Sequence, residues 1–182
     1  GLSLAIGLAL AEALDRVQEA AAPRVGLKWP NDLWLLDAPH AGRKLGGVLI
    51  ETVAAGAKRL AVIGVGLNVQ PMQAPEVGTG FACLQEIDAQ VEAPAVLHRL
   101  ALPLVQAIRR FEAEGFAGFV AAYSRRDLLL GQPVRTTQQG VAEGVAEGVD
   151  ERGALQVRTP AGLVAVTSGE VSVRLGADGG AG

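Results

Sequence analysis

The chain has 182 residues, of which 49% are hydrophobic and 19% charged, and its formal net charge is −3. This composition is typical of a globular protein and excludes a disordered chain, and the weak net charge gives no basis for general nucleic-acid binding. The single cysteine, Cys83, excludes an internal disulfide and a cysteine-rich metal site. We therefore expect Cys83 to fill the core and the protein to be cytoplasmic.

The first segment, residues 1–23, reads GLSLAIGLALAEALDRVQEAAAP. Its apolar residues Ile6, Leu10 and Leu14 recur at helical spacing, and acidic residues interrupt the apolar run before it could cross a bilayer. The start also lacks the basic residues of a signal peptide. The pattern predicts a buried amphipathic helix that ends before Pro23, and no membrane association.

Four β-strands are predicted next, at residues 24–29, 33–36, 44–53 and 59–69. Short connections between successive strands indicate an antiparallel sheet. The last strand is apolar on both faces, which predicts a central position in the sheet. The first two strands are separated by Pro-Asn-Asp at 30–32, where a missing backbone donor and two turn-forming residues place polar groups at a strand end.

The remainder divides into a helical part and a β-rich part. A short helix is predicted at 82–88, a longer one at 94–115 that Pro103 should kink or split, and a further helix at 116–129. From about residue 130, short β-like runs separated by glycines predict a small antiparallel barrel of about fifty residues. The fold class predicted from these elements is α+β.

Three short segments on adjacent predicted strands contain the rarer polar residues: Lys28–Asp32, Arg43–Gly47 and Gly64–Asn68. They hold both asparagines of the chain, Asn31 and Asn68, and two of its three lysines. A lysine provides a compact charge that approaches a carboxylate or phosphate closely. The combination favours a site where an acid meets a nucleotide phosphate.

Glycines and one carboxylate complete this group. The pairs 46–47 and 64/66 let backbone N–H groups approach a ligand, and Asp32 suits Mg²⁺ binding or proton acceptance. Structural roles remain open for the same residues: the glycines as β-bulges, Lys28 as a solvated strand residue, and Asp32 as a turn cap.

The segment KWPNDLWLLDAPHAGRKLGGVLIE (28–51), followed by VIGVGLNV (62–69), resembles the biotin protein ligases. The stretch GTGFACLQE (78–86) is similar to the family's loop with an adenine-stacking aromatic residue, and GQPVR with the later β-runs resembles its C-terminal SH3-like domain. The resemblance extends over nearly the whole chain, and the order of the three motifs is what makes it specific.

The resemblance implies a fold and a domain organisation. The fold is a class II synthetase-like mixed sheet with helices, followed by a small SH3-like β-barrel. We expect a catalytic domain at 1–126, the barrel at 127–176 and a disordered tail at 177–182.

The resemblance also implies a two-step reaction. The carboxylate of biotin attacks the α-phosphate of ATP, bound with Mg²⁺, and biotinyl-5′-AMP and pyrophosphate form. A lysine of the biotin carboxyl carrier protein then attacks the adenylate and becomes biotinylated. A homodimer is a further expectation, whereas no DNA-binding domain is recognised in the chain.

Roles for individual residues come only from this resemblance. Lys44 and Asp32 are the expected catalytic residues, with Lys44 as the central one. Asn31 and Asp32 would orient the phosphate and the metal or help deprotonate the acceptor lysine. Residues expected to bind biotin or the adenylate are Gly46, Gly47, Gly64, Gly66, Asn68, Phe81 (against adenine) and Arg174 (reaching back from the barrel).

Two motifs of the family are not found. A GRGRRGR-like loop and a strand with Ser or Thr precede the first helix in these ligases, and the chain starts at Gly1 without an initiator methionine. We therefore expect it to be part of a longer ligase. Two alternatives stay open: a lipoate-type acyl ligase of the same fold, and a non-catalytic remnant that acts as a binding module.

Overall fold

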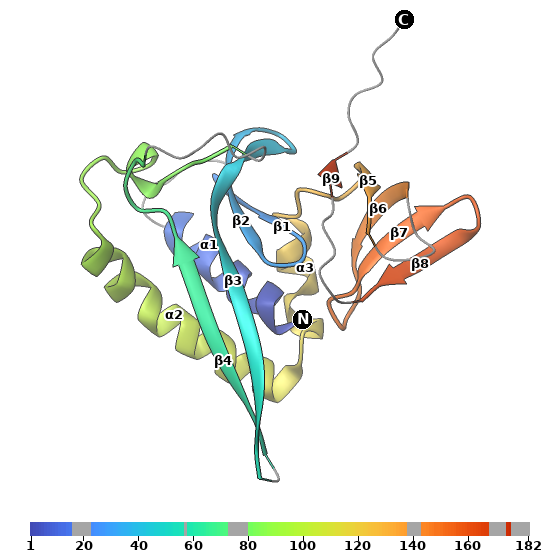
Figure 1. The fold of residues 1–182 in the computed structure, drawn as a ribbon, viewed down its shortest axis with the longest axis horizontal. Coiled ribbons are helices and arrows are strands. Elements are labelled where there is room, and N and C mark those ends of the chain that lie inside the picture. Colours follow the sequence, from blue (N-terminus) through green and yellow to red (C-terminus); the bar gives the residue numbers. More distant parts are fainter. Residues whose placement is uncertain (16–22, 57, 73–79, 138–142, 168–173, 176–182) are drawn as a thin grey trace, which may run out of the picture.

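The computed structural model describes residues 1–15, 23–56, 58–72, 80–137, 143–167 and 174–175, with side chains except at 58, 174 and 175. Its strands form two antiparallel sheets, and helices cover one side of the first (Figure 1). The predicted disordered tail lies outside these residues.

The first sheet confirms the four predicted strands and their antiparallel pairing. Its order is β1-β2-β3-β4, and the strands are β1 (Val25–Lys28), β2 (Asp32–Ala38), β3 (Ala41–Ala55) and β4 (Lys58–Leu67). The predicted central position of β4 is wrong, because β4 is an edge strand of this sheet. Leu60 and Val62 on β4 are 54% and 56% exposed.

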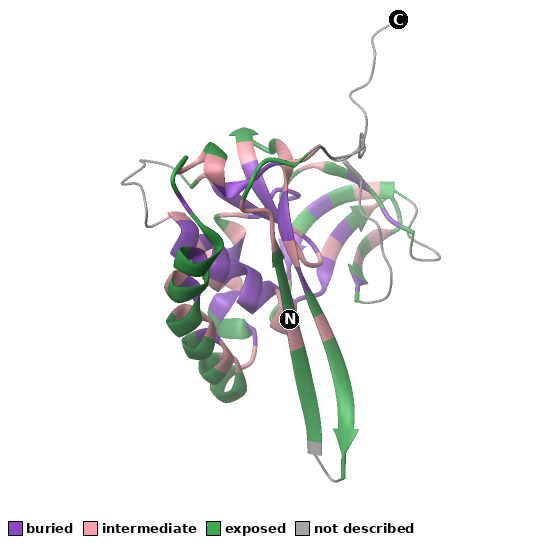
Figure 2. Ribbon diagram, turned by 60° about the vertical axis from the view of Figure 1, so that its left-hand side comes forward, coloured by how far each residue is buried: buried purple, intermediate pink, exposed green. Residues whose placement is uncertain are grey.

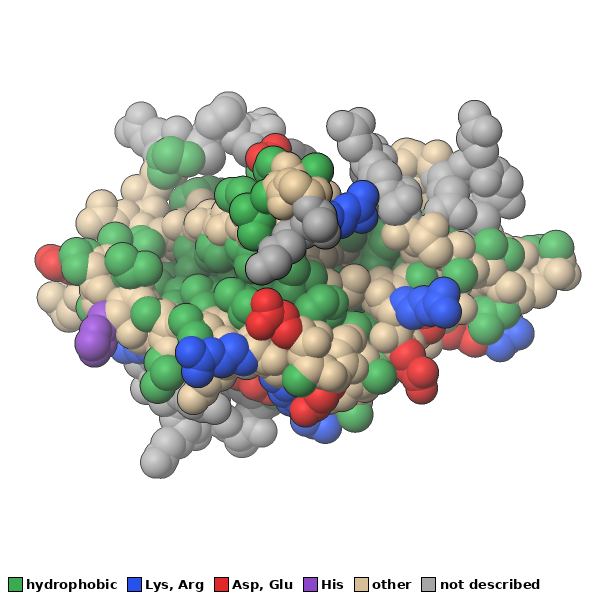
Figure 3. Space-filling model, turned by 90° about the horizontal axis from the view of Figure 1, so that it is seen from below, with side chains coloured by type: hydrophobic (Ala, Val, Ile, Leu, Met, Phe, Trp, Pro, Cys, Tyr) green, Lys and Arg blue, Asp and Glu red, His purple; other side chains and the backbone are tan. Residues whose placement is uncertain are grey.

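The far end of the β3–β4 hairpin explains this error. The hairpin extends past the helices, and its outer half is exposed on both strands (Figure 2). Seen from below, apolar side chains gather over the middle of the molecule, between charged residues (Figure 3). An apolar pattern alone does not distinguish a buried strand from a strand that no other element covers.

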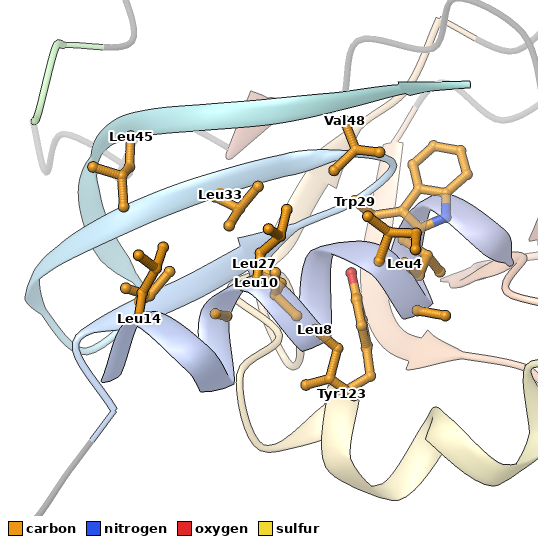
Figure 4. Packing of buried hydrophobic residues seen from close by; sticks show 14 of the residues in the cluster. Leu4, Leu8, Leu10, Leu14, Leu27, Trp29, Leu33, Leu45, Val48 and Tyr123 are labelled. Carbon is orange, nitrogen blue, oxygen red and sulfur yellow. The ribbon is translucent and has the colours of Figure 1, made fainter. Parts of the chain in front are cut away.

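The core lies between the first sheet and α1 (Leu2–Asp15). Figure 4 shows leucines of α1 packed against Leu27, Leu33 and Leu45 from three strands. The predicted helix is confirmed over its described residues, but its amphipathic character is not. Side chains all around α1 are buried, because α2 covers the side that the sheet leaves open.

The remaining helices follow the prediction only in part. α2 (Ala93–Glu114) is one continuous helix, so Pro103 does not split it, since a single proline removes only one backbone donor. The helix predicted at 82–88 is only the 3₁₀ turn η1 (Leu84–Glu86). The helix predicted at 116–129 is the 3₁₀ turn η2 (Ala117–Phe119) followed by α3 (Val120–Ser124), and it ends early because residues 126–128 pair with β1. Cys83 is buried, as predicted. No helix within the described ranges combines the length and the apolar character that crossing a bilayer requires.

The second sheet confirms the β-rich C-terminal part. Its order is β8-β7-β6-β5-β9, from β5 (Pro133–Arg135), β6 (Glu143–Val149), β7 (Leu155–Thr159), β8 (Gly162–Val166) and β9 (Arg174–Leu175). Inward residues such as Leu155 and Val157 are fully buried. Among the described residues, no pairing between β8 and β9 closes the sheet into a barrel.

Two contacts fix the second sheet beside the first. The Trp29 indole Nε1–H donates to the Gly153 carbonyl oxygen, between β6 and β7, at 3.0 Å. Residues 126–128 also pair with β1, because Leu27 N–H donates to Arg126 O and Leu128 N–H donates to Leu27 O. The turn after β1, which holds Asn31, is therefore anchored from the C-terminal part.

Candidate active site

A β-bulge in β3 decides which face carries Lys44. Leu33 on β2 lies opposite Gly46, but the next residue, Trp34, lies opposite Lys44, so Leu45 is an extra residue on β3. Strict alternation would place Lys44 and Gly46 on one face. The bulge instead turns Leu45 into the core, where it is fully buried, and Lys44 to the opposite face.

Lys44 forms an ion pair on this face. Its Nζ lies 2.7 Å from Oδ1 of Asp32, which stands opposite Gly47 in the register. The side chains of Lys44 and Asp32 are 42% and 21% exposed. Both charges are therefore open to a ligand.

A cavity of about 690 Å³ adjoins this ion pair. Every predicted site residue whose side chain is described lines it: Asn31, Asp32, Lys44, Gly46, Gly47, Gly64, Gly66, Asn68 and Phe81. Arg174 belongs to β9, where it pairs with Arg135, and its side chain lies outside the described part. The cavity is mainly apolar apart from the ion pair and the two asparagines, which suits a ligand with one anionic end.

The glycines of the cavity are of two kinds. A Cβ on Gly66 would meet only Gly47 O, at 4.0 Å, and one on Gly64 would meet nothing nearer than Leu49 O, at 3.6 Å. Packing does not demand glycine at these positions, so their effect is to keep the cavity floor flat. At Gly46, by contrast, a Cβ would collide with Gly66 O, so glycine is required by the close approach of β4.

The two asparagines hold the backbone around the cavity. Asn31 donates from Nδ2 to Val48 O at 2.9 Å, and Val48 N–H donates back to Asn31 O at 2.9 Å. Asn68 donates from Nδ2 to Lys44 O at 3.3 Å and to Ala82 O at 3.0 Å. Because these bonds use the Asn68 amide hydrogens, a direct ligand contact is left to its Oδ1.

Phe81 reaches the cavity from a segment that continues the sheet where β4 ends. It forms a parallel bridge with Lys44, in which Ala82 N–H donates to Lys44 O at 3.0 Å. Phe81 is half-buried and lines the cavity instead of joining the core cluster. Its ring is thus available to a flat ligand.

Arg43 and Leu49 are two of the contributors that the sequence analysis did not predict; Val48, Val65, Leu67 and Gly80 also line the cavity. Leu49 lines the cavity, and the signal was available, since it follows Gly47 by two residues on the same strand face. Arg43 bonds to Asp37, Glu86 and the Phe81 carbonyl behind the cavity wall, and its guanidinium lowers the pKa of both carboxyl groups. The short connection between the strands predicted at 33–36 and 44–53 brings Asp37 near Arg43, but no sequence signal places Glu86 or Phe81 there.

Comparison with known proteins agrees with this geometry. The family model described as the biotin/lipoate A/B protein ligase family matches residues 1–68, and that of the biotin protein ligase C-terminal domain matches residues 129–174. The biotin–(acetyl-CoA-carboxylase) ligase of Paracoccus denitrificans is 34% identical in an alignment that covers 93% of this chain and 71% of that protein. The bifunctional ligase/repressor BirA of Salmonella typhimurium is 34% identical over 96% of this chain and 53% of its own length.

Solved structures show the same relationship. Biotin protein ligase from Aquifex aeolicus in complex with biotin and ATP has a TM-score of 0.79 and 28% identity, over 96% of this chain and 71% of that one. The chain spans about half the length of the BirA proteins that it matches. On the identity to the Paracoccus denitrificans enzyme and the share of it covered, the chain belongs to the biotin protein ligase family.

Proposed function

We propose that the protein attaches biotin to a lysine of a biotin carboxyl carrier protein, with ATP, through biotinyl-5′-AMP. The observation that carries the proposal is the Lys44–Asp32 pair at a glycine-floored cavity that Phe81 also lines. Two relatives support the ligands: one is named a biotin–(acetyl-CoA-carboxylase) ligase, and one solved structure is a complex with biotin and ATP.

In the first step, a carboxylate oxygen of biotin attacks the α-phosphorus of ATP, and pyrophosphate leaves. Both reactants are anions, so the main barrier that the protein can lower is electrostatic. We assign this role to Lys44, whose ammonium would lie between the carboxylate and the phosphate. Gly47, Gly64 and Gly66 would admit the biotin rings and chain against the open strand backbone, with Gly46 keeping β3 and β4 close.

Asp32 is assigned to the metal that accompanies ATP. Among the described residues, no group of three His, Cys, Asp or Glu side chains could hold a metal ion unaided. A site for Mg²⁺ commonly combines one or two carboxylates with substrate phosphates, and Asp32 fits as that single carboxylate. Asn31 would hold Asp32 in place through its two bonds to Val48.

The nucleotide would occupy the end of the cavity near Asn68 and Phe81. We assign Phe81 to stacking on the adenine ring and Asn68 Oδ1 to a polar contact with the adenylate. Arg174 is assigned, by family resemblance, to reach the nucleotide from β9. In the second step, the acceptor amine attacks the biotinyl carbonyl carbon and AMP leaves, and we assign to Asp32 the removal of a proton from that amine.

Domain organisation and assembly follow as further proposals. We place the domain boundary near residue 127, because α3 ends at Ser124 and the C-terminal family model begins at residue 129.

A homodimer would form most simply by pairing the open edge of β4 with the same edge of a second copy. Sedimentation of the full-length protein would test it, and a monomer at all concentrations would exclude it.

The test is biotin-dependent exchange of labelled pyrophosphate into ATP, followed by transfer to a purified carrier domain. Biotin should support both reactions and lipoate neither, because the family model that matches the C-terminal part is that of biotin protein ligases. Exchange with lipoate would favour the lipoate-type alternative. No exchange with either acid, from well-folded full-length protein, would favour a non-catalytic binding module.

A further inference from the structure

Arg43 links the β2–β3 hairpin to residues 81–86, which lie 38 to 43 residues further along the chain. Its Nε and Nη2 donate to Asp37 at the end of β2, at 3.0 and 2.8 Å. Its Nη1 and Nη2 donate to Glu86 in η1, at 3.1 and 2.8 Å, and Nη1 also donates to the Phe81 carbonyl oxygen at 3.0 Å. One guanidinium thus fixes the segment that carries the Phe81 ring to the rigid β2–β3 pair.

The aliphatic part of Arg43 supports the same segment. Gly80 has a φ of +67°, and a Cβ there would lie 2.7 Å from Arg43 Cγ. The backbone at Gly80 therefore rests directly on the arginine stem. Glu86 fixes the other end, because its Oε1 also accepts a hydrogen bond from Cys83 N–H at 3.0 Å.

Few other bonds hold Phe81 in place. Lys44 N–H to Gly80 O is long, at 3.4 Å. Among the described residues, the closer bonds to this segment are Ala82 N–H to Lys44 O, the Asn68 amide to Ala82 O and, three residues after Phe81, Leu84 N–H to Asn68 O. Arg43 itself does not line the cavity. We therefore expect Arg43 to affect a bound ligand through the backbone of Phe81.

We propose that Arg43 is a positioning residue for the nucleotide half of the site, which holds the Phe81 ring where an adenine base stacks. This inference rests on the proposed function, and it assigns different tasks to the neighbouring residues Arg43 and Lys44. Lys44 would act on the reacting groups, whereas Arg43 would act only on base binding. Loss of Arg43 should then weaken ATP binding and leave biotin binding unchanged.

The experiment measures KM for ATP, KM for biotin and kcat of pyrophosphate exchange in the full-length protein. Arg43→Ala should raise KM for ATP by about fivefold, the equivalent of roughly 1 kcal/mol for lost charge-assisted hydrogen bonds, with kcat and KM for biotin within about twofold. Arg43→Lys should restore little of this, because an ammonium cannot bridge three acceptors in a plane. The matched control is Arg158→Ala, which breaks an ion pair with Glu147 on the second sheet and should change none of the three values.

A double-mutant cycle separates positioning from general damage. If Arg43 acts through Phe81, Arg43→Ala should not raise KM for ATP further in a Phe81→Ala background. An equal rise in both backgrounds, a matching rise in KM for biotin, or an unchanged KM for ATP would overturn the inference. Titration calorimetry of ATP binding, run on the same variants, would test Arg43 even if the wild type showed no exchange, a result that would overturn the proposed function alone.

Discussion

Lys44 Nζ lies 2.7 Å from Asp32 Oδ1 across the β2–β3 pair, on the side of the sheet opposite to α1. The pair exists only because the bulge at Leu45 turns Lys44 away from the core. Since both side chains remain partly exposed, a ligand carboxylate could approach Lys44 without displacing any backbone. The Lys44 ammonium is therefore in place before the substrates bind, with its charge balanced by the Asp32 carboxylate.

Replacing Lys44 by alanine should therefore remove the proposed electrostatic role and leave the fold intact. We expect the rate of biotin-dependent pyrophosphate exchange to fall by at least about tenfold. Arg109→Ala, on the exposed side of α2, is the control for losing one positive charge. Near-normal exchange in Lys44→Ala would remove this residue from the mechanism.

The order of strands could be predicted, whereas the position of Lys44 could not. Apolar alternation and short connections were enough for an antiparallel meander, and they follow from local chemistry. The bulge at Leu45 is a property of pairing between β2 and β3, and neither strand shows it alone. The exposure of β4 and the burial of α1 on all sides likewise depend on what packs against each element, which a single pattern does not contain.

The candidate site, like the fold, could be predicted only in part. Residues from each of the three motifs line one cavity, because neighbouring strands bring them together. Arg43 had no visible role in the sequence because two of its partners, Glu86 and Phe81, come from a distant segment.

Phe81 offers a direct test of the nucleotide end of the cavity. Because the ring lines the cavity and does not join the core cluster, Phe81→Ala should weaken ATP binding by about 1–3 kcal/mol, the scale of base–aromatic stacking. Phe81→Tyr keeps the ring face and should bind ATP as the wild type does. Equal ATP affinity in all three proteins, measured by titration calorimetry, would exclude Phe81 from the site.

Substitutions of Gly66 on β4 and Gly46 on β3 should have different effects, the first on biotin affinity and the second on stability. Gly66→Val fills open cavity space, so the melting temperature should change little while biotin affinity falls by tenfold or more, at about 1.4 kcal/mol per tenfold. Gly46→Ala forces β3 away from β4, so it should lower the free energy of unfolding by about 1–3 kcal/mol. Differential scanning calorimetry with and without biotin distinguishes the two. A stable Gly66→Val that still binds biotin tightly would show that the ligand lies elsewhere.

Trp29 connects the site to the second sheet through one buried hydrogen bond, to Gly153 O at 3.0 Å. Trp29→Phe retains most of the apolar volume but leaves that carbonyl without its donor, which should cost about 1–3 kcal/mol of unfolding free energy. Urea denaturation measures this loss. Unchanged stability would mean that the two sheets are held together mainly by other contacts, such as the pairing of residues 126–128 with β1.

Asp127 makes a prediction about pH. Burial raises its pKa to about 6, although Leu129 and Leu130 N–H groups and the nearby His40 favour the ionised form. On the side of α3, the buried Tyr123 is the other titratable group near it, and burial keeps the Tyr123 pKa well above its usual value. The second oxygen, Oδ2, has no hydrogen-bond partner among the described residues.

A folded-state pKa above the unfolded value of 3.8 means that the folded protein binds this proton more tightly than the unfolded chain. The stability that Asp127 contributes is therefore complete below about pH 4 and is lost as the pH rises to about 6. Asp127→Asn keeps an oxygen acceptor for the Leu129 N–H and does not titrate. Relative to this variant, the wild type should lose about 3 kcal/mol of unfolding free energy between pH 4 and 7.

Urea denaturation at a series of pH values measures that difference. The carboxylates with lowered pKa values, such as Asp37 and Glu86, destabilise both proteins equally as the pH falls, so they cancel in the comparison. Any fixed cost of placing an amide at the Oδ2 position is independent of pH, so it moves the Asp127→Asn curve by a constant amount and leaves the pH dependence of the difference unchanged. Parallel curves across this range would show that Asp127 has the same pKa in the folded protein as in water. Solvent would then have to reach its carboxylate.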